Sequence, residues 1–298
     1  MLITPTYDLP IFANKFFRYL KRQHYSADTI LAYQKDLNRF DDFLFQTYKG
    51  NILTEEIQKE DIQDFLAFLE EDNLAPNSIL RHLSTLKSFY KFLVFEMDFK
   101  VDVAGRIRHK AVYTPLPEPL SFEEIEAFFQ AAKEHSTFFH ALFSLTYYTG
   151  SRISPIRELL KEHIDLDQQK VYFPKVKNDK DLHLPLHEAV IPILADYFIE
   201  TRHNHSKYVF PSPKIKNQPV SRACIRVNIK KIAAKAGIKK RVYPHLLRHS
   251  TATHLTLLDV NQKFIATILG HSDLRATDRY QKLNVENLRS KLNKLDHF

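Results

Sequence analysis

The sequence is poor in the residues and segments that mark secreted, membrane or metal-dependent proteins. Its 298 residues include a single cysteine, Cys224, which excludes an internal disulfide framework and fits a reducing compartment. We find no run of about 18 or more apolar residues and no signal-peptide pattern at the N-terminus. There is also no Asp/Glu cluster or His-x-x-His spacing that indicates a bound metal. We therefore expect a soluble, cytoplasmic protein that works without a metal or another cofactor.

Charge is distributed unevenly along the chain. Residues 1–105 hold 12 Lys and Arg against 16 Asp and Glu, whereas residues 106–298 hold 31 against 19. A hydrophobic content of 44% is ample for folded cores, and the length suits one large or two ordinary domains. The basic C-terminal part favours a polyanionic partner, most simply nucleic acid, although a net charge of this size also serves solubility.

Helical periodicity dominates residues 1–104. Apolar positions recur at helical spacing over residues 9–24 and again after Ser26, which we expect to cap a second helix. Asp61 is the expected N-cap of a third helix, and Pro76 is suited to open a fourth. We therefore predict a compact N-terminal domain of four or five helices.

Basic side chains group on the first and fourth of these helices. Spacings of three or four residues put such side chains on one face of a helix. We consider six of them candidate contacts to DNA phosphates: Lys15, Arg18, Arg22, Arg81, Lys87 and Lys91. Ordinary solvated helix faces carry the same residue types, so the sequence leaves both interpretations open.

A basic segment with several prolines, residues 105–119, separates the two parts of the chain. Its prolines favour an extended backbone, so we expect an interdomain linker. A second domain, residues 120–298, is expected to begin at the capping box Ser121–Glu124. Within it, residues 138–148 predict a buried helix and residues 170–186 predict a β-hairpin. Helices dominate the remainder, so we predict a mainly α fold with a small antiparallel sheet.

Four short motifs in the C-terminal part hold residues suited to attack on a phosphodiester. The motifs are Thr149–Ser154, Pro244–Leu255, Leu269–Ser272 and Thr277–Tyr280. They contain two arginines, two histidines and a tyrosine: Arg152, His245, Arg248, His271 and Tyr280. Guanidinium groups match the planar geometry of phosphate oxygens and keep their charge at any pH. Each motif is a weak signal when taken alone, and the combination is what favours this chemistry.

Together with the N-terminal segment Ser26–Phe43, these motifs resemble the tyrosine recombinase, or phage integrase, family. In size and layout the chain is similar to Xer-type recombinases and compact integrases, and the resemblance covers nearly all of it. The resemblance implies a SAM-like core-binding domain, followed after the linker by an α-rich catalytic domain. It implies a site-specific recombinase, a DNA strand transferase that cleaves and rejoins DNA through a 3′-phosphotyrosine intermediate and a Holliday junction.

The resemblance assigns the central chemistry to three residues. It implies that Tyr280 attacks the phosphorus while Arg152 and Arg248 hold the scissile phosphate. Because a phenol has an unperturbed pKa of about 10, the two guanidinium groups are also expected to favour its ionised form. The same charges stabilise the transition state. One phosphodiester is exchanged for another, so the reaction requires neither a metal nor ATP.

The resemblance gives supporting roles to three further residues. Lys177, in the turn of the predicted hairpin, is implied to protonate the leaving 5′ oxygen, and Lys180 takes its place if the hairpin register differs. His245 is implied to act as an acid, a base or a hydrogen-bond donor. His271 is implied to donate to a phosphate oxygen.

One position departs from the family's pattern. The family often has a glutamate three residues after its first arginine, where this chain has Pro155. Proline is tolerated in the first turn of a helix, but the support that a glutamate gives Arg152 is missing. Glu158, about one turn further on, is our candidate substitute.

The resemblance also implies the partners. These are a double-stranded recombination site and a homotetramer on two such sites, with or without a second recombinase. An apolar stripe predicts a C-terminal helix that either docks on a neighbouring protomer or packs on its own domain: Leu283, Leu288, Leu292 and Leu295.

Two other functions stay open on the sequence alone, namely a type IB topoisomerase-like enzyme and a DNA-binding regulator without catalysis. Within the family, the sequence does not distinguish chromosome-dimer resolution, transposon cointegrate resolution, and integration or excision of a mobile element.

Overall fold

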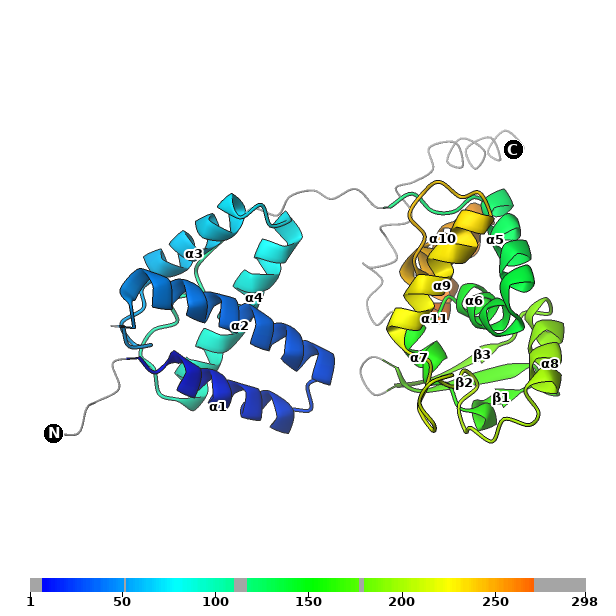
Figure 1. Cartoon of the computed structure of the whole chain (residues 1–298), viewed down its shortest axis with the longest axis horizontal. Helices are drawn as coiled ribbons and strands as arrows, with labels where there is room; N and C mark the ends of the chain where they lie inside the picture. Colours follow the sequence, from blue (N-terminus) through cyan, green and yellow to red (C-terminus); the bar gives the residue numbers. More distant parts are fainter. Residues whose placement is uncertain (1–6, 51, 110–116, 177–179, 271–298) are drawn as a thin grey trace, which may run out of the picture. The chain divides into compact units, whose positions relative to one another are not determined.

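The chain is mainly α-helical and divides into two compact units, Met1–Pro115 and Leu116–Phe298 (Figure 1). The computed structural model describes residues 7–50, 52–109, 117–176 and 180–270. Each unit has its own hydrophobic core. Among the described residues, no helix has the length and apolar character needed to cross a bilayer. The mainly α fold class with a small antiparallel sheet is confirmed.

The described part of the N-terminal unit folds into four helices: α1 (Leu9–Arg22), α2 (Ala27–Tyr48), α3 (Lys59–Glu71) and α4 (Pro76–Glu96). Ser26 caps α2 as predicted, because its hydroxyl accepts the backbone N–H of Thr29 at 3.2 Å. The prediction that Asp61 caps α3 is wrong by three residues. Asp61 lies in the first turn, and its carboxylate reaches back to accept the N–H of Gln58 at 2.7 Å.

Aromatic side chains from all four helices fill the core of this unit. Phe16, Phe40, Phe65 and Phe89 are at most 1% exposed, and the rings of Phe40 and Phe65 meet edge to face at 5.0 Å. The core continues beyond α4, where Ile107 is 3% exposed. The first residues of the predicted linker therefore pack in the N-terminal unit.

A buried carboxylate joins α2 to α4. Asp36 is 2% exposed, pairs with Arg81 and accepts the hydroxyl of Thr85 at 2.8 Å. Burial lowers the pKa of His82, whose Nδ1 lies 3.5 Å from the same carboxylate. Arg81, one of the candidate DNA contacts, therefore also takes part in the packing of two helices.

The C-terminal unit combines helices with a three-stranded sheet. Its elements are α5 (Phe122–His135), α6 (Thr137–Thr149), α7 (Ile153–Arg157), the short 3-10 helix η1 (Lys161–His163), β1 (Ile164–Asp165), β2 (Lys170–Val176), β3 (Lys180–Pro185), α8 (Val190–Glu200), α9 (Arg222–Lys235), α10 (Pro244–Leu257) and α11 (Gln262–Ile268). The strands are antiparallel in the order β1-β2-β3, and Val171 pairs with Leu184. The predicted hairpin is confirmed, and its turn, residues 177–179, lies outside the described residues.

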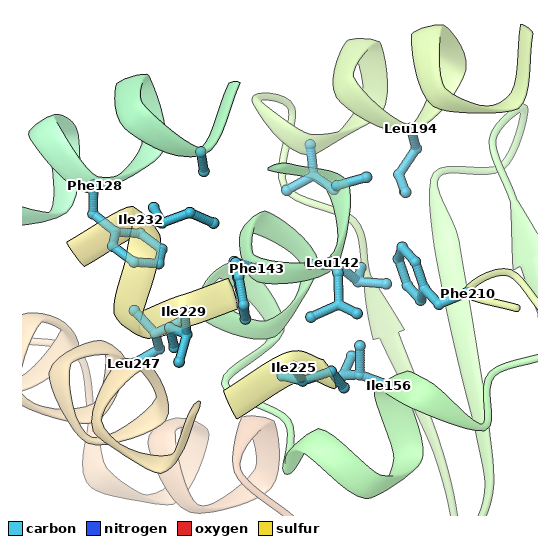
Figure 2. Close-up of a cluster of buried hydrophobic side chains, with 14 of the residues drawn as sticks. Phe128, Leu142, Phe143, Ile156, Leu194, Phe210, Ile225, Ile229, Ile232 and Leu247 are labelled. Carbon is cyan, nitrogen blue, oxygen red and sulfur yellow. The ribbon is translucent and has the colours of Figure 1, made fainter. Parts of the chain in front are cut away.

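Helix α6 forms the centre of this unit. It packs against α5, α8 and α10 and, as predicted, is a buried helix, with every residue from Ala141 to Thr146 buried. Figure 2 shows Leu142 and Phe143 of α6 among side chains from the surrounding elements, including Phe128 and Leu247. This packing fixes the end of α6, where the first of the four motifs begins.

Candidate active site

Helix α10 presents two of the predicted catalytic residues from one side. It begins at Pro244, as predicted, where the missing N–H of proline leaves no intrahelical bond unmade. His245 and Arg248 follow, three residues apart. His245 is exposed to solvent, whereas Arg248 is only 3% exposed. The helix therefore holds one of the two side chains inside the fold and offers the other at the surface.

Two backbone carbonyls hold the guanidinium of Arg248. Nη1 donates to the oxygen of Gly150 at 2.8 Å, and Nη2 donates to the oxygen of Leu269 at 2.8 Å. Gly150 ends α6 with φ +57°, and a Cβ there would come within 2.7 Å of the Leu269 side chain, so the position requires glycine. Through one side chain, the structure joins three of the four sequence motifs.

Arg152 is held differently. It precedes α7 with an extended backbone, φ −66° and ψ 150°, and it is partly exposed. Within the described part of the chain, its side chain forms no hydrogen bond or ion pair. The guanidinium is therefore available to an anion.

His245 lies within the electrostatic reach of both arginines. Partial loss of water around its ring, followed by the positive charges of Arg248 and Arg152, lowers the pKa of the imidazole below its ordinary value. The ring is therefore neutral at pH 7. The structure thus brings together three of the six predicted catalytic residues in one cluster.

The other three predicted catalytic residues, Lys177, His271 and Tyr280, lie outside the described residues. Lys180, the alternative to Lys177, begins β3 and pairs through its backbone with Val176. No group of three or more His, Cys, Asp or Glu residues able to hold a metal gathers within the ranges that the structure describes.

Pro155 stands where the family resemblance implies a glutamate, and Glu158 does not take over the support of Arg152. Pro155 lies in the first turn of α7, as expected, and Glu158 follows the last residue of this helix. The carboxylate of Glu158 pairs with Arg157. Our hypothesis that Glu158 supports Arg152 is therefore wrong, because Glu158 stands at the opposite end of the helix with a nearer cationic partner.

The polar residues that follow Arg248 hold the start of the C-terminal unit. His249 Nε2 lies 2.9 Å from the oxygen of Pro117, and Ser250 accepts the N–H of Leu120 at 2.9 Å. His254 Nε2 lies 2.8 Å from the oxygen of Leu120. Burial lowers the pKa of both histidines, which are therefore neutral at pH 7. We predicted no role for these residues from the sequence, although polar side chains in a helix that is buried from residue 246 to residue 254 indicate bonded partners.

The six candidate DNA contacts differ in their surroundings. Lys15, Arg18 and Arg22 are all exposed on α1. On α4, Arg81 pairs with Asp36, as described above. Lys87 is partly exposed, and the ammonium of Lys91 lies 5.9 Å from the ring centre of Phe95.

Helix α9 carries a basic stripe that we did not predict from the sequence. Arg222, Arg226 and Lys230 are exposed and follow one another at intervals of four residues, so they share a face. Arg222 Nη2 donates to the hydroxyl of Ser154 at 3.1 Å, two residues from Arg152. The stripe therefore begins beside the candidate site, and the spacing of its cations was the signal that could have revealed it.

Comparison with known proteins agrees with this architecture. The chain matches the N-terminal SAM-like domain of phage integrases over residues 13–97 and the phage integrase family over residues 118–287. It is 32% identical over 265 residues to a tyrosine recombinase of Thermosipho africanus, which covers 87% of this chain and 89% of the relative. It is 30% identical over 276 residues to the tyrosine recombinase XerD of Staphylococcus aureus, covering 90% and 92% of the two chains.

A solved structure shares the fold over almost the full length. The XerH site-specific recombinase, bound to its difH substrate in a pre-cleavage complex, has a TM-score of 0.76 and 18% sequence identity. The match covers 98% of this chain and 97% of that one. With both family models matched in order and relatives at 30% identity or more, the chain belongs to the phage integrase family of tyrosine recombinases.

Proposed function

We propose that Tyr280 attacks the scissile phosphate of a specific DNA site and that Arg152, His245 and Arg248 form the catalytic cluster around that phosphate. The family makes the chain a site-specific recombinase, a DNA strand transferase, and does not favour the topoisomerase or regulator alternatives. One observation carries the assignment of the cluster: Arg248, three residues after His245 on α10, donates to the oxygen of Gly150, which lies only two residues before Arg152.

Electrostatic stabilisation is the main contribution of this cluster. Attack on a phosphodiester builds negative charge on the non-bridging oxygens, and cations fixed near those oxygens stabilise it without reorganising. Arg248 is fixed in this sense by its bonds to Gly150 and Leu269. Arg152 supplies a second cation whose hydrogen-bonding groups are available to the phosphate.

His245 has a different contribution, because its ring is neutral at pH 7. A neutral imidazole can accept the phenolic proton of Tyr280 or donate a hydrogen bond to the phosphate. The arginines that lower its pKa also disfavour a third positive charge in the cluster. His245 is therefore suited to move a proton during the reaction.

The remaining roles follow the family resemblance. Lys177 protonates the leaving 5′ oxygen, with Lys180 as the alternative, and His271 donates to a phosphate oxygen. Leu269, whose oxygen binds Arg248, lies two residues before His271. This continuity supports the proposal that His271 completes the same site.

The proposed division of labour follows the chain. Residues 1–104 form the core-binding domain, 105–119 the linker, whose first residues pack on that domain, and 120–298 the catalytic domain. DNA contacts include Lys15, Arg18, Arg22, Arg81, Lys87 and Lys91. The proposal includes a cytoplasmic location, in keeping with a DNA substrate and a single cysteine.

Recombination breaks four strands, so we expect four protomers on two DNA sites. An apolar pocket of about 310 Å³ in the C-terminal unit is lined by Leu184, Leu255, Leu258 and Ile268, among others. The predicted stripe between Leu283 and Leu295 lies outside the described residues. Its docking in this pocket of a neighbouring protomer is our proposal for how protomers join.

Trapping on DNA tests the function. The wild type, Tyr280→Phe and the control Tyr25→Phe are incubated in EDTA with nicked, end-labelled duplexes from DNA flanking the gene. Tyr25 is a suitable control because it lies in the N-terminal unit and is 47% exposed. We expect an SDS-resistant adduct with the wild type and Tyr25→Phe, and none with Tyr280→Phe. An adduct with Tyr280→Phe would contradict the assignment of the nucleophile, and an adduct that requires a divalent metal would contradict the mechanism.

A further inference from the structure

Two arginine side chains tie the short helix α7 to the segment that opens α9. Arg157, the last residue of α7, donates from Nε to the oxygen of Val220 at 2.9 Å, and its side chain is 18% exposed. Arg222, the first residue of α9, donates from Nη2 to the hydroxyl of Ser154 at 3.1 Å. The two bonds run in opposite directions between the same two segments, so both ends of α7 are held. We call this pair of bonds the arginine brace.

The segment that receives α7 is itself well fixed. Val220 is fully buried, and its N–H donates to the oxygen of Phe210 at 2.9 Å. Ser221 caps α9 by accepting the N–H of Cys224 at 3.1 Å. Ile156 anchors the middle of α7 in the hydrophobic core with no exposed surface. The brace therefore attaches α7 to a rigid support.

Arg152 depends on this attachment more than a residue in a long helix would. It is the residue before α7, and its side chain has no partner within the described residues. A helix of five residues has almost no stability of its own, because too few bonds offset the cost of its first turn. The location of the Arg152 guanidinium is consequently set by how α7 is held.

We propose that Arg157 and Arg222 are positioning residues for Arg152, because the arginine brace fixes the short helix that follows it. The inference rests on the proposed function, in which Arg152 holds the scissile phosphate. Arg157 holds the end of α7 through a largely buried side chain, whose charge is balanced by Glu158. Arg222 acts through Ser154.

The test separates positioning from binding and from folding. Arg157→Met and Arg222→Met are compared with the wild type for single-turnover cleavage at saturating protein and for Kd, on the same nicked duplex. Arg202→Met, a change in an exposed arginine whose Nε bonds to the adjacent His203, is the matched control. We expect cleavage to fall about tenfold in each brace variant, because small displacements of a catalytic group are costly. The Kd of the brace variants should stay near the wild-type value. The control should have both a Kd and a cleavage rate near those of the wild type.

A second substrate identifies Arg152 as the group affected. Replacing one non-bridging oxygen of the scissile phosphate by a methyl group removes the charge that Arg152 is proposed to neutralise. We expect the defect of each brace variant to shrink on this methylphosphonate duplex. The ratio of the two rates is measured on one protein preparation, so it does not depend on the fraction that is folded. An equal defect on both substrates would overturn the proposal.

A double-mutant cycle tests the route through Ser154. If Arg222 acts through that hydroxyl, Ser154→Ala and Arg222→Met reduce the rate by similar factors and the double variant is no slower than either. Arg222→Lys, which keeps a donor, should retain most of the rate. Additive losses, or a raised Kd with normal cleavage at saturation, would make Arg222 a direct DNA contact and overturn the inference. A wild type that forms no adduct would instead contradict the proposed function.

Discussion

Arg248 and Arg152 belong to two regions of the C-terminal unit that hold a cation by different means. Around Arg248, the helix is buried from residue 246 to residue 254, and two carbonyl oxygens bind the guanidinium. Around Arg152, the backbone is extended, the helix that follows has five residues, and the side chain is partly exposed. The first cation is part of the packing of the unit, whereas the second depends on the attachment of a short helix.

This contrast separates stability from catalysis. Removing Arg248 leaves the oxygens of Gly150 and Leu269 without this donor in a buried setting, which costs free energy of folding. Removing Arg152 leaves no described group without a partner. Both changes remove a cation from the proposed phosphate site. Both changes should therefore slow cleavage, but only the loss of Arg248 should lower the free energy of unfolding.

The largest effect is expected for Arg248→Ala. Adduct formation on the nicked duplex should fall about a thousandfold, the range for losing a fixed electrostatic contact in a transition state. The free energy of unfolding should fall by roughly 2–4 kcal/mol, because two buried carbonyls lose a charged donor. Single-turnover cleavage and urea denaturation measure the two losses. A variant as stable as the wild type would show that the carbonyl bonds contribute nothing net.

Arg152→Ala should lose activity without losing stability. We expect adduct formation to fall by about a hundredfold or more, and the unfolding midpoint in urea to remain at the wild-type value. The same two measurements on Arg152→Lys sharpen the result, since lysine keeps the charge but not the planar fork. A clear drop in stability for Arg152→Ala would mean that the two regions do not differ as the structure indicates.

Local signals in the sequence were sufficient for the elements but not for the contacts between them. Ser26, Pro76 and Pro244 mark helix starts because their effects act within one turn. The prediction for Asp61 was wrong because its carboxylate caps the helix from the third helical position. The N-cap itself is a glutamine, which is unusual there.

Contacts between distant parts of the chain are different. Arg248 donates to carbonyls 98 and 21 residues away, and Arg157 donates to one 63 residues away. No periodicity encodes which carbonyl a side chain meets, so these partners required the structure.

Gly150→Ala tests the region around Arg248 by changing the backbone that binds this arginine rather than the arginine itself. The substitution forces a left-handed backbone on alanine and brings a methyl group within 2.7 Å of Leu269, whose oxygen binds Arg248. We expect a loss of roughly 1–3 kcal/mol in stability and slower cleavage. Gly237→Ala is the matched control, because that glycine also has a positive φ but no atom near its missing Cβ. Equal stability losses in the two variants would assign the effect to backbone strain alone.

The smallest expected effect concerns the pKa of His245, which reports on both arginines at once. Partial loss of water around the ring and the charges of Arg248 and Arg152 hold this pKa below the ordinary value of 6.5. The folded chain therefore favours the neutral ring, and the associated stability is lost as the pH falls from about 6.5 through the lowered pKa. Cleavage should decline over the same acid range, because protonation removes a base from the cluster.

Arg152→Met should raise the pKa of His245, since it removes one of the charges that oppose protonation, while leaving the partial desolvation of the ring and the charge of Arg248 in place. An NMR titration of the His245 ring measures the shift, and the residual activity of the variant should show its acid limb displaced to higher pH. Arg202→Met serves again as the control for a general loss of positive charge. If the pKa of His245 is the same in Arg152→Met and the wild type, Arg152 stands too far from the ring in solution, and the attachment of α7 must be looser than its two hydrogen bonds indicate.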